Sequence, residues 1–187
     1  MTDNRWMQTF TGRKYWPLNP RIEDICIEDI AHHLSQKVRY TGACIWLYTV
    51  GQHSCLVCDL APSRLKLKGL MHDGGETYLP DAGKPIKGDL IGFKEIEKRN
   101  QDLIDYKYHV PDDPEGIIKY IDNRILVDER QQVMTKTDYE WPQIVGLEPF
   151  GIKIERWEPE RTKAEFLKRF YKLTEPHGNQ ITIFEKL

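Results

Sequence analysis

Apolar residues recur at helical spacing along most of this chain, and this periodicity constrains its fold more than any other feature. The first such run extends from Arg21 to Val38, with an apolar residue at every third or fourth position, as on the buried face of an amphipathic helix. Further helical runs are predicted over 62–73, 76–79, 93–106, 114–134 and 161–173, and a mostly apolar run covers 48–60. Pro114 is expected at the first position of its helix, which proline favours. The chain is therefore predicted to be all-α in its core.

Length and charge narrow the class of protein. The 187 residues are enough for one domain with a real core. The 27 basic and 29 acidic residues give a net charge of −2, which argues against bulk binding of nucleic acid, because that requires an excess of Lys and Arg. The chain has neither the ~20-residue apolar stretch of a membrane helix nor a secretory signal at its start. We therefore expect a cytoplasmic protein without a membrane partner, whose four cysteines stay reduced.

The sequence indicates a single domain over residues 1–187, since it contains no repeat and no low-complexity linker. Within it, residues 1–20 are rich in aromatics but broken by prolines, and are expected to form an irregular arm packed on the domain. Residues 21–135 form the predicted core, and residues 136–187 a C-terminal extension. A short strand or an extended end is expected at 180–184.

Four possible metal ligands lie within apolar helical runs, namely His53, His72, Asp73 and Asp122. Burial of an unpaired carboxylate or imidazole is costly, and one shared ion would satisfy all four. Two imidazoles and two carboxylates suit Mn, Fe, Co, Ni or Zn and are poor for Ca.

Alternatives to a metal site remain open at each position. A lone buried histidine is more often a core residue whose hydrogen bonds are satisfied, and Asp122 could simply pair with Arg124 or Arg130. Gly74 and Gly75 follow His72-Asp73 directly. Each weakens a helix by roughly 1 kcal/mol relative to Ala, so we expect their small size to permit close approach of a ligand.

Taken together, these residues form an H…HD…D pattern with HDxxE at 72–76, and the chain resembles the HD-domain metal-dependent phosphohydrolases. The finer resemblance is to the small 5′-deoxynucleotidase branch and its phage relatives. It rests on TFTG at 9–12, IEDIAHHLS at 27–35, RY at 39–40, YTVGQHS at 48–54, GLMHDGGETYLPDAGKPIK at 69–87 and IDNRILVDE at 121–129. The resemblance covers Thr9 to about Met134 and is diffuse beyond.

The resemblance implies a role for each matching position. His53, His72, Asp73 and Asp122 would bind a divalent transition metal (Co, Mn, Zn, Fe or Ni), with Mg possible alongside a polyphosphate substrate. Glu76 would act as general acid/base, and Asp81 would complete the acid/base or sugar-binding set. The residues expected to bind the phosphate and sugar are Arg39, Tyr40 and Lys87, with His32 lining the pocket. Small relatives are usually homo-oligomers, so a homo-oligomer is expected.

The implied reaction is hydrolysis of the bond between O5′ and the α-phosphorus of a 2′-deoxynucleotide. A deoxynucleoside triphosphate, with dATP as in phage control of nucleotide pools, would yield deoxynucleoside and triphosphate. A monophosphate would yield deoxynucleoside and phosphate, as in a 5′-deoxynucleotidase. A binding module that senses nucleotides without cleaving them is the alternative of another class, and the complete ligand set together with Glu76 favours the enzyme.

Two other features have simpler interpretations. Cys55-x-x-Cys58 lacks the second pair that zinc ribbons have, so both thiols are predicted to lie in the core. Trp6, Trp16 and Trp46 could stack on a base, although tryptophans in small domains are usually part of the core.

Overall fold

The computed structural model describes residues 4–80, 82 and 84–175, and it confirms a mostly helical fold. The α-helices are α1 (Ile27–Gln36), α2 (Val50–Leu60), α3 (Lys66–Met71), α4 (Lys84–Lys87), α5 (Phe93–Lys107), α6 (Ile117–Gln132) and α7 (Pro159–Thr174). Short 3-10 helices are η1 (Ile22–Asp24), η2 (Arg39–Gly42), η3 (Ser63–Leu65), η4 (Gly74–Tyr78) and η5 (Pro142–Ile144). The possible strand at 180–184 lies outside the described residues.

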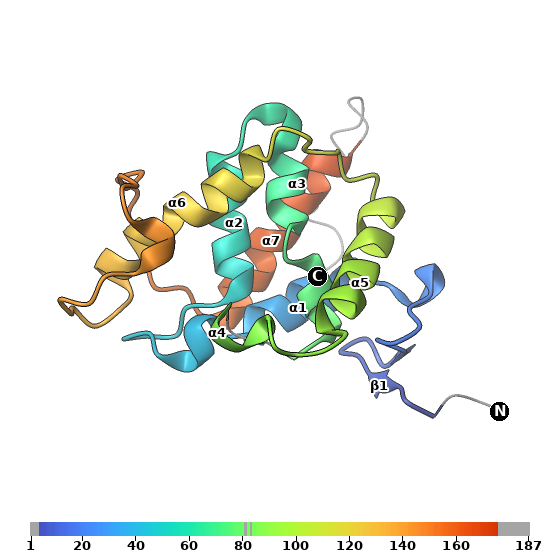
Figure 1. Ribbon diagram of the computed structural model, residues 1–187. Coiled ribbons are helices and arrows are strands. Elements are labelled where there is room, and N and C mark those ends of the chain that lie inside the picture. The colour runs from blue at the N-terminus through green and yellow to red at the C-terminus, as the bar shows by residue number, and fades with distance from the viewer. Residues whose placement is uncertain (1–3, 81, 83, 176–187) are drawn as a thin grey trace.

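The main core lies where α1, α2, α3 and α7 pack together in the middle of the molecule (Figure 1). The buried side chains at this junction include Ile30, Leu34, Cys55, Leu70, Phe166 and Phe170. Two of them, Phe166 and Phe170, come from α7, so the C-terminal part of the chain supplies a central helix of the core. The predicted boundary at residue 135 therefore does not separate the core from an appendage.

Helix α6 lies against one side of α2, and α5 lies on the other side of the bundle (Figure 1). Ile118, Ile121 and Ile125 of α6 pack with Val57 of α2 and with Leu65. This packing fixes the face of α6 that carries Asp122 toward α2, and so determines which side chains can meet there.

The first predicted helix is broken in two. Ile25 and Cys26 are extended, so η1 and α1 are separate where one helix over 21–38 was expected. At the break, the Lys107 ammonium donates to the backbone carbonyls of Ile22 and Ile25, at 2.8 and 2.7 Å. A contact from a distant helix thus stabilises a break that local periodicity does not show.

Helix α6 also begins later than predicted. Pro114 does not start it, because Gly116 has φ 69° and ends the preceding turn, so the helix begins at Ile117. The Asp113 carboxylate accepts hydrogen bonds from the backbone N–H groups of Ile117 and Ile118, at 3.0 and 2.7 Å. A side-chain cap therefore takes the place of the expected proline start.

The N-terminal arm contains a short hairpin and is more regular than expected. Strands β1 (Met7–Gln8) and β2 (Lys14–Tyr15) pair antiparallel around the TFTG turn. The Asp29 carboxylate of α1 accepts from the backbone N–H and the hydroxyl of Thr11, at 2.7 and 2.9 Å. These bonds attach the turn to α1.

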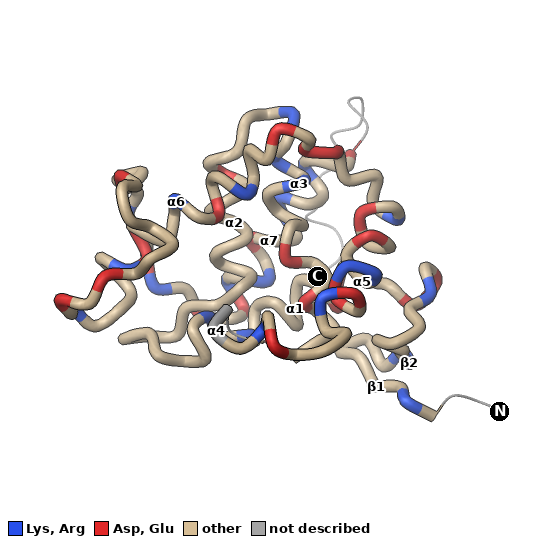
Figure 2. Tube along the Cα trace, viewed as in Figure 1, with Lys and Arg blue, Asp and Glu red and all other residues tan. Residues whose placement is uncertain are grey.

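Acidic and basic residues are interspersed along the described chain (Figure 2). In that part of the molecule, every helix is too short or too polar to cross a membrane.

Candidate metal centre

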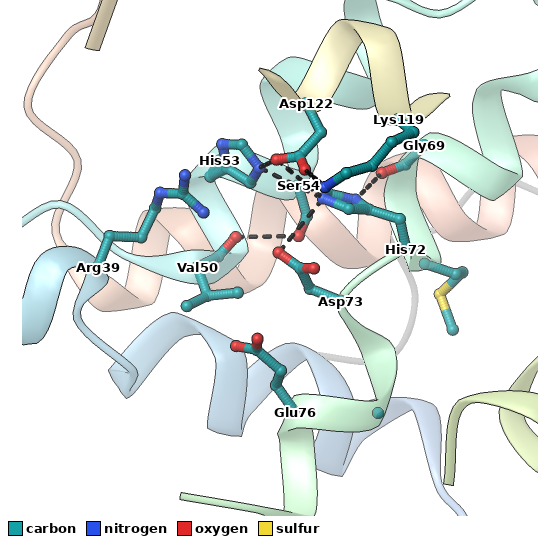
Figure 3. A network of polar contacts seen from close by, with 12 residues as sticks. Arg39, Val50, His53, Ser54, Gly69, His72, Asp73, Glu76, Lys119 and Asp122 are labelled. Carbon is teal, nitrogen blue, oxygen red and sulfur yellow. Dashed lines mark hydrogen bonds and ion pairs between the residues drawn. The ribbon is translucent and has the colours of Figure 1, made fainter. Parts of the chain in front are cut away.

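Three of the four predicted ligands converge from three different elements. His53 comes from α2, His72 directly follows α3, and Asp122 comes from α6, and one ligand atom of each lies within 4.8 Å of the others. The His53 Nε2 atom is 3.3 Å from His72 Nε2 and 3.2 Å from Asp122 Oδ1. Figure 3 shows the three side chains pointing toward one another. This group could hold a metal ion.

Both imidazoles use the ring nitrogen that faces away from the cluster as a hydrogen-bond donor. His72 Nδ1 lies 2.8 Å from the Gly69 carbonyl, which can only accept, so this nitrogen carries a proton. His53 Nδ1 lies 2.6 Å from Glu129 Oε1 and donates to that carboxylate. Metal-binding histidines are oriented in this way by a carbonyl or carboxylate behind the ring. In the neutral rings, both Nε2 atoms then present lone pairs to each other.

Two lone pairs at 3.3 Å repel unless a positive charge lies between them. The surrounding carboxylates also favour a positive charge within the cluster. Burial lowers the pKa of His72, but the nearby Asp73 and Asp122 carboxylates outweigh burial and raise this pKa to about 9. Burial raises the pKa of Asp122, but His53 and His72 outweigh it and hold that pKa well below the usual range. The chemistry of the donor set therefore fits a divalent cation.

Asp73 lies beside this group rather than within it. Its Oδ2 atom is 3.2 Å from His72 Nε2, the nitrogen that faces the cluster. Burial raises the pKa of Asp73, but His72 and His53 outweigh burial and lower it. The second oxygen of Asp122 is 2.8 Å from the ammonium of Lys119, a residue that the sequence analysis did not identify. Asp122 does not pair with Arg124 or Arg130, which instead donate to backbone carbonyls.

Glu129, which no sequence pattern had singled out, is a fully buried carboxylate directly behind His53. Its Oε1 accepts from His53 and from the Tyr48 hydroxyl at 2.9 Å, and its Oε2 accepts from Arg39 at 3.1 Å and from the Tyr40 hydroxyl. Burial raises the pKa of Glu129, but Arg39, His53 and the Tyr40 hydroxyl together outweigh burial and lower this pKa to about 2. Glu129 thus ties a candidate ligand to the Arg39–Tyr40 pair.

A cavity of about 470 Å³ opens beside the metal centre. Asp73 and Asp122 line it, as do four other residues with predicted roles: Arg39, Tyr40, Glu76 and Lys87. The Lys87 ammonium lies 3.9 Å from Glu76 and 2.5 Å from Glu97. The structure therefore brings most of the predicted substrate-binding residues to one cavity at the metal centre.

Two predicted residues are not placed there. His32 lies in a groove between the hairpin and α1, where its ring stacks on Phe10 at 3.7 Å between centroids. Because His32 faces this groove, it does not line the cavity at the metal centre. Asp81 lies outside the described residues.

The glycines after Asp73 have a different role from the one predicted. A Cβ atom on Gly74 would approach Ile104 to 3.2 Å, and one on Gly75 would approach the Glu97 carbonyl to 3.1 Å. Helix α5 occupies the space beside both glycines, and Gly75 also lines a smaller cavity of about 260 Å³. These two glycines therefore permit close packing of η4 on α5.

The cysteine prediction is confirmed, since Cys55 and Cys58 are buried free thiols within the main core. Trp6, Trp16 and Trp46 do not line the cavity, whereas Trp141 does, and no sequence signal had singled it out.

Comparison with known proteins gives relatives along nearly the whole chain. The chain is 31 % identical over 173 residues to the uncharacterized protein YfdR of Escherichia coli (strain K12), covering 91 % of this chain and 96 % of that protein. It is 30 % identical over 186 residues to the uncharacterized protein RCAP_rcc00048 of Rhodobacter capsulatus, covering 90 % and 95 %. The chain belongs to the family of these proteins. No protein-family model matches it. Neither relative's name states an activity.

Proposed function

We propose that this protein is a metal-dependent phosphohydrolase of the HD type that cleaves the bond between O5′ and the α-phosphorus of 2′-deoxynucleotides. One observation carries the proposal: His53 and His72 direct Nε2 atoms, together with Asp122, to one point beside a cavity lined by basic side chains. A buried cluster of this kind needs a cation, and the adjoining basic groups suit an anionic substrate.

The bound ion would supply Lewis acidity, which makes attack of water on phosphorus possible near neutral pH. Arg39, Lys87 and Lys119 line the cavity and would bind the phosphate oxygens. Glu76 lines the same cavity and would take a proton from the attacking water. The water oxygen bonds to phosphorus, the P–O5′ bond breaks, and O5′ gains a proton.

We favour a triphosphate substrate because the phosphate side of the site has further room. A second cavity, of about 260 Å³, shares Asp73, Glu76 and Lys87 with the first, and Lys94 and Lys98 line it together with Glu97 and Asp102. Phosphates beyond the α-phosphate could extend into it. The favoured products are therefore deoxynucleoside and triphosphate, with dATP as the first substrate to test. Hydrolysis of a monophosphate by the same attack is the alternative.

Product analysis tests the proposal. Purified protein is incubated with Co²⁺, Mn²⁺, Mg²⁺ or Zn²⁺ and with dATP or dAMP, and the products are separated by chromatography. Deoxyadenosine with triphosphate from dATP would support the favoured reaction, and phosphate from dAMP alone would make the protein a 5′-deoxynucleotidase. His72→Ala should abolish either activity, whereas His33→Ala, a histidine outside the cavity, should retain it. Nucleotide binding without cleavage under every metal would overturn the enzyme and support a nucleotide sensor.

A further inference from the structure

The cavity at the metal centre has two chemically different ends. At one end, Asp122 and Lys119 form an ion pair, and Glu76 lies near Lys87. At the other end, Tyr40, Leu126 and Trp141 belong to one apolar cluster, with the Tyr40 and Trp141 rings 5.3 Å apart between centroids. A ligand that fills the whole cavity therefore meets charged groups at one end and flat apolar groups at the other.

Helix α6 links the two ends. Asp122 and Leu126 are four residues apart on it, so they share a face and lie about 6 Å apart along the helix axis. The apolar end is thus held at a fixed short distance from the metal centre by one rigid element.

Trp141 and Gln143 lie in the segment that follows α6. Side chains of α6 anchor this segment by hydrogen bonds before Trp141 and after Gln143. Before Trp141, the Arg130 guanidinium donates to the carbonyls of Thr137 and Tyr139, at 3.1 and 2.7 Å. After it, the buried Asp128 carboxylate accepts from the backbone N–H groups of residues 150, 151 and 152 at 2.7–3.0 Å. Between these anchors, Ile144 is buried against Leu126 and Val127. The segment is therefore preorganised at the cavity.

We infer that Trp141 and Gln143 form a subsite for the nucleobase, an inference that rests on the proposed function. Trp141 offers an indole face for stacking, which every base accepts regardless of sequence. The exposed Gln143 amide, which also lines the cavity, offers one donor and one acceptor group, the pattern that pairs with an adenine edge. Because this segment lies beyond residue 134, the choice of base is made outside the part of the chain that carries the metal and phosphate residues.

The subsite is tested by comparing a nucleotide with a substrate that lacks the base. In Trp141→Ala, KM for dAMP or dATP should rise roughly 10–100-fold, the equivalent of the stacking contribution of one base. The kinetic constants for the base-free counterpart, 2-deoxyribose 5-phosphate for dAMP or 2-deoxyribose 5-triphosphate for dATP, should not change, because it has no base to stack. Trp141→Phe should remain near wild type. Tyr139→Ala, an exposed aromatic of the same segment that does not line the cavity, is the matched control.

Equal losses for both substrates, or no loss for either, would overturn the subsite. If Trp141→Ala does not fold, Gln143→Ala provides a second test. This variant should change the ratio of kcat/KM between dATP and dGTP. An unchanged ratio would overturn the subsite. If the wild-type protein cleaves no substrate with any metal, the proposed function fails but the subsite is still measurable. Deoxyadenosine should then quench tryptophan fluorescence in the wild type and not in Trp141→Phe, and equal quenching in both would overturn it.

Discussion

Two pairs of histidines lie in neighbouring parts of the molecule and differ in how their ring nitrogens are used. His33 uses both nitrogens within the protein: Nδ1 lies 2.9 Å from the Thr77 carbonyl, and Nε2 accepts from the backbone N–H of Phe10 at 3.1 Å. His32 is stacked on Phe10. His53 and His72 each use only Nδ1 in this way, and each directs Nε2 to the other and to a carboxylate. A structural histidine and a candidate ligand therefore differ in the partner of the Nε2 atom.

Removal of a candidate ligand should give the largest effect. Loss of a group that only orients a ligand costs roughly 10–100-fold in metal affinity, so loss of the ligand itself should cost more than about 100-fold. We therefore expect His53→Ala and His72→Ala to lose Zn²⁺ binding, measured by competition with a chelating dye. His33→Ala should bind Zn²⁺ like the wild type. Comparable loss in all three variants would remove the distinction between the pairs.

The next largest effect should come from Glu129, which orients His53. In Glu129→Gln, an amide NH₂ replaces an oxygen that accepts two hydrogen bonds, and Arg39 loses its charge partner. We expect Zn²⁺ affinity to fall roughly 10–100-fold and the free energy of unfolding to fall by about 3–5 kcal/mol. Both can be measured on one preparation, by dye competition and by urea denaturation.

Asp128 provides the matched control, since it is an adjacent buried carboxylate on the same helix that does not contact His53. Asp128→Asn should lower the free energy of unfolding by about 1–3 kcal/mol, because one of its backbone partners loses its acceptor. Its Zn²⁺ affinity should not change. If Asp128→Asn weakens Zn²⁺ binding as much as Glu129→Gln does, general destabilisation explains both results.

A stability effect without a metal effect is expected for His33. In His33→Ala, the Phe10 N–H and the Thr77 carbonyl lose their partner, which costs about 1–3 kcal/mol where they are shielded from water. The melting temperature should then fall, by roughly 2–4 °C for each kcal/mol in a chain of this size. Calorimetry measures this fall. An unchanged melting temperature would show that the His33 hydrogen bonds contribute nothing to stability.

Much of the metal centre could be predicted from the sequence because its side chains lie within apolar helical runs, where a polar group needs a partner. Glu129 was within reach of the same reasoning, since it lies seven residues after Asp122, two helical turns along the same face of α6. Lys119 lies three residues before Asp122, also on this face. Helical spacing from Asp122 would thus also have identified Glu129 and Lys119 as residues of the site.

Other features depend on contacts between distant segments, which periodicity does not contain. Trp141 reaches the cavity only because Arg130 and Asp128 hold the segment after α6. A missing Cβ can make room for a ligand or for a neighbouring helix, and at Gly74 and Gly75 the neighbour is α5. Side-chain caps and tertiary contacts likewise decided where α1 and α6 begin.

The smallest effect is expected from the thiols, a further residue type in this chain that can bind metals. Burial raises the pKa of the Cys58 thiol from 9.0 to about 11, so the folded state favours the neutral thiol. Since the unfolded chain loses this proton first, the stabilising contribution is complete below pH 9 and is lost as the pH rises toward 11. The difference in melting temperature between wild type and Cys58→Ala should therefore shrink over this range, while Zn²⁺ affinity stays equal at neutral pH. A loss of Zn²⁺ binding in Cys58→Ala would instead identify this thiol as a ligand. His53 and His72 would then no longer differ from the groups buried in the core in their capacity to bind metal.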